Sequence, residues 1–74
     1  MKIAIAGQIA EAMRELAMRK NTYPRLIGSG KMKQSEADLC LARMEAIRDT
    51  LLFCQQHEAD IRSYIAAKRE AVAS

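Results

Sequence analysis

Alternating steps of four and three separate the apolar residues in one stretch of this chain, CLARMEAIRDTLLFCQQHEADIRSYI, residues 40–65. This spacing places side chain after side chain on one face of an α-helix, and it is typical of helices that pack against other helices. Glu58 interrupts the seam, whose members are Cys40, Met44, Ile47, Leu51, Cys54, Ile61 and Ile65. The pattern predicts one long helix over residues 35–69, roughly 50 Å in length at 1.5 Å per residue.

The composition indicates one small helical domain spanning residues 1–74. Half of the 74 residues are apolar, three are aromatic and none is tryptophan. Ala, Leu and Met are strong helix formers, and no stretch alternates cleanly enough to indicate a sheet. We therefore expect an all-α fold. A chain this short buries little interior and stabilises itself only marginally.

A shorter helix is expected over residues 3–21. Its apolar stripe consists of Ile5, Ile9, Ala12/Met13 and Leu16, and its outward face of Glu11, Arg14, Glu15 and Arg19. Pro24 disfavours helix at Tyr23, so the helix should end before this point. The loop over residues 22–34 then contains a short turn that begins at Pro24 and is stopped by Gly28 and Gly30.

Ser35 is the expected N-cap of the long helix. Helices joined by a short connection usually pack antiparallel, which predicts a two-helix hairpin. Folding the chain about residue 28 pairs Leu16 with Leu41, Met13 with Met44, Ile9 with Ile47 and Ile5 with Leu51.

In this hairpin the first helix is too short to pack against the part of the long helix that follows Cys54. The end of the long helix therefore lacks a partner within the chain, and we expect a homodimer, forming a two-fold helical bundle. The residues expected at its interface are Cys54, Glu58, Ile61 and Ile65. A buried Glu58 would need a cation, either Arg62 or a base from the other subunit; the alternative is a solvated position at the rim.

A second group of apolar residues, Leu39, Phe53 and Tyr64, lies nearly opposite Met44 on the long helix, with His57 nearby. We call Phe53, His57 and Tyr64 the outer patch. Because it cannot belong to the same seam, two interpretations remain: a packing face for another subunit, or a docking surface for a different protein.

No catalytic, metal or cofactor site is expected. The segment Gly28-Ser29-Gly30-Lys31 resembles a phosphate-binding loop, but that motif requires glycine in place of Arg25 and a hydroxyl in place of Met32. His57 is the only histidine, and no second cluster completes a zinc site. Cys40 and Cys54 would lie about 21 Å apart on one helix, which is too far for a disulfide. Reduced thiols in a cytoplasmic protein are expected, with a bridge across a dimer as the alternative.

No apolar run approaches the roughly 20 residues needed to cross a bilayer, so no membrane association is expected. Charge is unevenly distributed: residues 14–33 hold six basic residues against Glu15 alone, whereas from residue 34 onward seven acids exceed five bases. The basic residues, among them Arg19, Arg25 and Lys31, would gather at the closed end of the hairpin as a basic tip. Such a tip fits a nucleic-acid backbone or an acidic protein face.

Residues 18–51 resemble a group of small bacteriophage and prophage proteins of proteobacteria. The matching segments are Arg19 with Tyr23-Pro24-Arg25, then Gly30-Lys31-Met32, Gln34, Glu36-Ala37-Asp38 and Met44-Glu45-Ala46-Ile47. In such proteins a threonine often follows the Gly-Lys-Met segment and would cap the helix; Lys33 stands there in this chain. The resemblance implies a phage-derived accessory protein inside an infected bacterium, without transferring an activity or a binding residue.

These observations predict a non-enzymatic helical protein that homodimerises and binds a host macromolecule, most simply a protein whose activity it modulates or blocks. The partner-binding residues expected are the outer patch together with Arg19, Arg25 and Lys31. The alternative is a nucleic-acid-binding accessory protein that uses the basic tip. No small-molecule substrate is expected.

Overall fold

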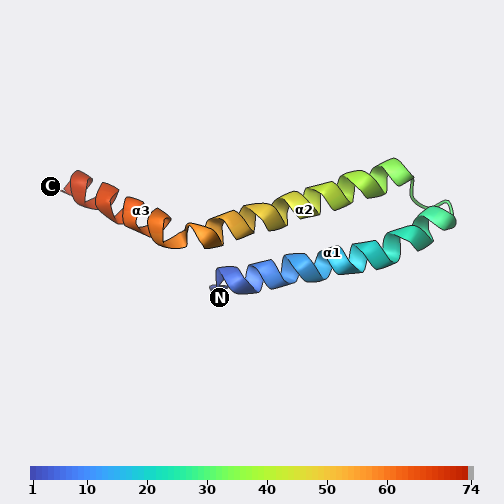
Figure 1. The fold of residues 1–74 in the computed structure, drawn as a ribbon, viewed down its shortest axis with the longest axis horizontal. Helices are drawn as coiled ribbons and strands as arrows, with labels where there is room; N and C mark the ends of the chain where they lie inside the picture. The colour runs from blue at the N-terminus through green and yellow to red at the C-terminus, as the bar shows by residue number, and fades with distance from the viewer. Residues whose placement is uncertain (74) are drawn as a thin grey trace.

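The chain folds into helices joined by short connections. The computed structural model describes residues 1–73 and contains α1 (Ile5–Gly28), α2 (Gln34–Gln56) and α3 (Glu58–Ala73). No strand occurs in this range, which confirms the all-α prediction. Helices α1 and α2 lie antiparallel and side by side, and α3 leaves the open end of the pair as an arm (Figure 1). The radius of gyration is 18.1 Å, against about 11 Å for a compact chain of this length.

A small apolar cluster holds α1 against α2. Leu16 is only 4% exposed and packs with Ala12 of α1 and Met44 of α2. Leu41 and Leu51, both half-buried, pack against this cluster. The other buried apolar residues are Ile9 and Ala37. Because these few side chains make up the whole core, each contributes a large share of the stability of the α1–α2 pair.

The predicted interface between the first two helices is wrong at two positions. Met13 and Ile47 are 54% and 51% exposed, so neither lies between the helices. Neighbouring helix residues are about 100° apart around the axis, and Ala12 therefore replaces Met13 in the interface. Ala12 is 4% exposed and packs against Met44.

The sequence predicted that the first helix ends before Pro24, and this prediction is wrong. Helix α1 continues through Pro24 to Gly28. A proline inside a helix removes one N–H donor, although its backbone φ angle remains compatible with helix. Tyr23 and Ile27 of this additional segment are half-buried, and they line an open groove of about 430 Å³ with Leu41 of α2. Figure 1 shows α1 curving towards α2 in this region.

Backbone hydrogen bonds close the end of α1. The N–H of Ser29 donates to the carbonyl of Arg25 at 3.0 Å, and the N–H of Lys31 donates to that of Leu26 at 2.9 Å. Gly30 has a φ of 75°, a conformation that L-amino acids with side chains rarely adopt. Helix α2 then begins at Gln34, with Lys33 at the N-cap position and no side-chain capping bond. The predicted cap at Ser35 is therefore wrong.

The long helix predicted over residues 35–69 is broken at His57. This residue has φ −109° and ψ 14°, which ends α2 in the sparsely populated bridge region between helix and strand. Helical bonding continues on both sides of the bend, because the His57 N–H donates to the Phe53 carbonyl at 3.1 Å and the Ile61 N–H donates to the His57 carbonyl at 2.9 Å. The chain changes direction here without unfolding, and α3 does not fold back on the other helices (Figure 1).

Candidate functional site

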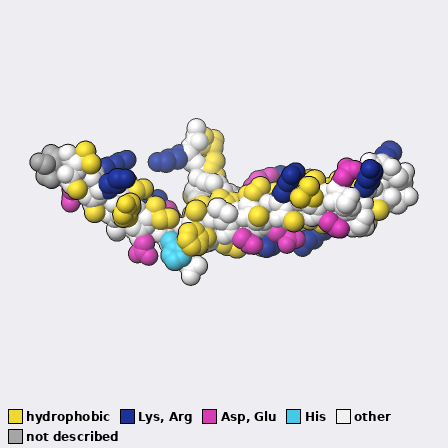
Figure 2. Space-filling view, turned by 90° about the horizontal axis from the view of Figure 1, so that it is seen from above, with side chains coloured by type: hydrophobic (Ala, Val, Ile, Leu, Met, Phe, Trp, Pro, Cys, Tyr) yellow, Lys and Arg dark blue, Asp and Glu magenta, His cyan; other side chains and the backbone are white. Residues whose placement is uncertain are grey.

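Helix α3 lies outside the core along its whole described length. Every side chain from residue 59 to residue 72 is exposed, including Ile61, Ile65 and Tyr64 at 40%, 43% and 68%. Apolar side chains are visible along this arm and around the single histidine in Figure 2. A helix of about 15 residues is marginally stable in water unless tertiary packing supports it. Within the described chain, α3 therefore lacks the packing that supports α1 and α2.

One row of side chains follows α3 and the last turn of α2. We name this row the α3 stripe; its members are Cys54, Glu58, Ile61, Ile65, Lys68 and Val72. Two open grooves lie along it. The first, about 260 Å³, includes Cys54, Glu58 and Ile61, together with Ile5 at the start of α1. The second, about 440 Å³, includes Ile65, Lys68 and Val72.

The α3 stripe contains all four residues predicted for a dimer interface, Cys54, Glu58, Ile61 and Ile65. Lys68 and Val72 were missed by the sequence prediction, although the alternating spacing continues through them. Lys68 is charged, and Val72 lies beyond the predicted end of the helix at residue 69. Extending the same spacing past Ile65 would have identified both.

Glu58 is half-buried in this row and pairs with a base of its own helix. Nη2 of Arg62 donates to Oε1 of Glu58 at 2.7 Å, the i to i+4 partner that the sequence suggested. The Glu58 side chain remains 43% exposed, so it keeps room for a second cation.

Only two of the three outer-patch residues lie together. The Phe53 and His57 rings have centroids 4.5 Å apart and planes inclined by 49°. Nδ1 of His57 lies 3.9 Å from Oδ2 of Asp60, across the first turn of α3. Phe53 is 60% exposed at the bend. Tyr64 lies on α3 beyond it and makes no ring contact with either residue in the described chain.

Two of the three predicted basic-tip residues are free at the closed end of the α1–α2 pair. Arg25 and Lys31 are exposed and form no ion pair within residues 1–73. Lys20 and Lys33 are also exposed near this end. None of these four bases forms an ion pair in the described chain, although Glu36 lies in the first turn of α2 at the same end.

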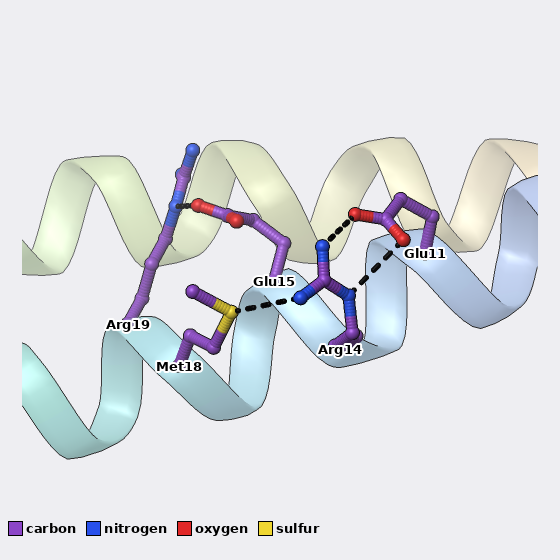
Figure 3. A network of polar contacts seen from close by, with 5 residues as sticks. All are labelled: Glu11, Arg14, Glu15, Met18 and Arg19. Carbon is purple, nitrogen blue, oxygen red and sulfur yellow. Dashed lines mark hydrogen bonds and ion pairs between the residues drawn. The ribbon is translucent and has the colours of Figure 1, made fainter.

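Arg19 is not an outward-facing residue, contrary to the prediction. Its Nε donates to Oε1 of Glu15 at 2.8 Å, and its Nη1 reaches α2, where it donates to the carbonyl of Cys40 at 3.0 Å. Figure 3 shows the guanidinium extending from α1 over the neighbouring helix. The hydrogen bond to Glu15 raises the pKa of the Arg19 guanidinium. Arg19 thus ties the two helices together and is only 29% exposed.

Replacing Arg19 with methionine should lower the free energy of unfolding by about 1 kcal/mol, since the Cys40 carbonyl loses its charged donor while most of the aliphatic stem is retained. Urea denaturation followed by circular dichroism measures this. The matched control is Arg14→Met, because Arg14 bonds only Glu11 and Met18 of its own helix. An equal loss in both variants would contradict the inter-helix role of Arg19.

Arg14 pairs with Glu11 on the same helix, and this second ion pair is more exposed than that of Arg19 with Glu15 (Figure 3). Hydrogen bonding from Arg14 holds the pKa of the Glu11 carboxyl below its ordinary value. Because the pKa of Glu11 is lower in the folded state, the ionised carboxylate stabilises the fold at pH values above its ordinary pKa. This stabilisation is lost as the pH falls through the folded-state pKa. Both side chains are 62% exposed, so solvent screens the pair.

Other functional features are few in the described part of the chain. Residues 1–73 contain no group of three or more His, Cys, Asp or Glu side chains placed to hold a metal ion. None of the helices in this range is both long and apolar enough to cross a membrane. Cys40 and Cys54 are free thiols and half-buried. The chain matches no protein-family model, no curated protein and no solved structure.

Proposed function

We propose that this chain is a non-enzymatic helical accessory protein that acts by binding, first to a second copy of itself and then to a protein of its host. The observation that carries this proposal is the exposure of α3, on which the apolar side chains of Ile61, Ile65 and Val72 are all exposed. Exposed apolar side chains gathered on one face of a helix are typical of a protein–protein interface.

The two surfaces have separate roles in this proposal. The α3 stripe joins two copies, and the outer patch remains free to contact the partner. Phe53 is suited to the second role, because a large exposed ring held against His57 loses little conformational freedom on binding. In keeping with the resemblance to phage proteins, we propose that the protein acts in the cytoplasm of an infected bacterium, where occluding a host protein requires no catalysis.

Replacing Phe53 and Tyr64 with alanine should reduce capture of the partner at least about tenfold, since exposed aromatic anchors provide much of the affinity of such interfaces. Affinity capture from a proteobacterial lysate with quantitative mass spectrometry measures this. Met13→Ala is the matched control, because Met13 is similarly exposed but lies on α1. If F53A/Y64A retained its fold and its captured protein, the outer patch would not be the docking surface.

Nucleic-acid binding through the basic tip is the second candidate, favoured by the exposed and unpaired Arg25 and Lys31. Arg19 is not available for it, because its donors are engaged by Glu15 and the Cys40 carbonyl. A salt titration of binding to DNA and RNA discriminates the two functions, since contacts to phosphates make affinity fall steeply with salt concentration. Absence of binding at low salt would eliminate this candidate.

A further inference from the structure

The α3 stripe has the same spacing in both directions. From Cys54 to Val72 its steps are four, three, four, three and four residues, which are symmetric about a point between Ile61 and Ile65. Two copies of α3 laid antiparallel about that point therefore bring Ile61 opposite Ile65 and Glu58 opposite Lys68. Val72 then lies towards the bend at His57, on the side of Cys54. Such self-complementarity is the requirement of a two-fold interface.

The charges in the stripe obey the same symmetry. Its only two charged members, Glu58 and Lys68, have opposite signs and lie at equal distances from the centre. The antiparallel arrangement thus places Glu58 of each copy against Lys68 of the other, twice per dimer. A parallel arrangement would place Glu58 against Glu58 and Lys68 against Lys68, which are repulsive pairs. Charge complementarity accordingly selects both the occupant and its direction.

The grooves along the stripe are related by this symmetry. The stripe residues of the first groove, Cys54, Glu58 and Ile61, correspond to those of the second, Val72, Lys68 and Ile65. Arg62 and Arg69, which line the sides of the two grooves, are not exchanged by this symmetry. Each groove would receive side chains from the opposite half of the second copy. Ile5 also lines the first groove, so the end of the second α3 would cover the start of α1 as well.

The elongated shape leaves much surface exposed. The described chain exposes 5993 Å², whereas a compact folded protein of this mass typically exposes about 4,600 Å². The α3 arm, whose side chains from residue 59 to residue 72 are all exposed, contributes to this excess.

From these observations we infer that α3 docks antiparallel on α3 of a second copy, centred between Ile61 and Ile65 and fixed in direction by reciprocal Glu58–Lys68 ion pairs. The inference deepens the proposed function and rests on its self-association. It specifies the direction and the register of the pair, which the proposed function leaves undetermined.

Charge reversal tests the direction. Lys68→Glu and Glu58→Lys, each alone, replace both attractive contacts by repulsive ones, and we expect the dimer dissociation constant to rise about 10- to 100-fold for each. Glu70→Lys is the matched control. It makes the same charge change as Glu58→Lys but lies on the side of α3 away from the stripe, so its dissociation constant should remain that of the wild type.

Mixing the two variants tests whether the loss is electrostatic, because a pair of one K68E and one E58K chain regains an attractive contact at both positions. The single variants test the direction, since a parallel wild-type pair already places like charges together and neither substitution would weaken it further. Sedimentation equilibrium of the 1:1 mixture should show dimer at wild-type concentrations, while each variant alone is largely monomeric. Unchanged self-association of K68E and E58K on their own would overturn the antiparallel register while leaving the proposed dimer in place. A monomeric wild-type protein would instead overturn the self-association itself.

Discussion

Replacing Leu16 with alanine is expected to lower the free energy of unfolding by about 3 kcal/mol, within the 2–5 kcal/mol typical of buried leucines. Leu16 is 4% exposed and lies in the centre of the cluster with Ala12 and Met44. A core this small rarely supplies more than about 3–5 kcal/mol in total, so most of the variant should be unfolded at ambient temperature. Thermal and urea denaturation followed by circular dichroism will measure the loss.

Met13→Ala is the matched control for Leu16→Ala, because it truncates a large apolar side chain on the same helix. Met13 is 54% exposed, so its loss should change stability by less than about 0.5 kcal/mol. Equal destabilisation by the two substitutions would show that the α1–α2 interface is formed by Met13, as the spacing of the sequence alone suggested.

Replacing Ile61 and Ile65 with aspartate should weaken self-association at least about 100-fold, because it places four unpaired carboxylates in the centre of the α3 interface. Without a partner, α3 has no packing to stabilise it, so the helical circular dichroism signal should also fall by up to the share of its 16 residues. Sedimentation velocity and circular dichroism on the same samples measure both effects.

Ser63→Asp/Ala67→Asp is the control for this variant. It adds the same charge to α3, but both positions lie on the side away from Ile65, where solvent remains in a dimer. The control should keep the mass of the wild type. If it dissociated the dimer as fully as I61D/I65D, net charge rather than the α3 stripe would govern association.

Local sequence pattern predicted the helical class and most of the helical segments, because spacing of apolar residues every three or four positions is a strong signal. It did not predict the end of α1. Pro24 normally marks a helix boundary, but here the helix continues through the proline to Gly28, with Tyr23 and Ile27 half-buried beside α2. The φ angle of proline is compatible with helix, and a short window of sequence does not show that the chain beyond it lies against a second helix.

The sequence pattern also did not predict the bend at His57. Neither proline nor glycine occurs there, and the apolar spacing continues across it. The Phe53–His57 ring contact and the exposed Glu58–Arg62 ion pair coincide with the change in direction. Both contacts join side chains four residues apart, a spacing that occurs equally in straight helices. The sequence therefore does not distinguish a bent helix from a straight one here. The symmetric positions of Glu58 and Lys68, by contrast, can be read from the sequence alone, once the four-and-three spacing is extended to Val72.

Sedimentation equilibrium of the wild-type protein across the micromolar range tests most directly whether a second copy covers the exposed row on α3. A dimer of two 8.3 kDa chains is the predicted result. A single-chain mass at every concentration, with α3 still helical, would contradict the account, because the apolar row would then be stable in water without any cover.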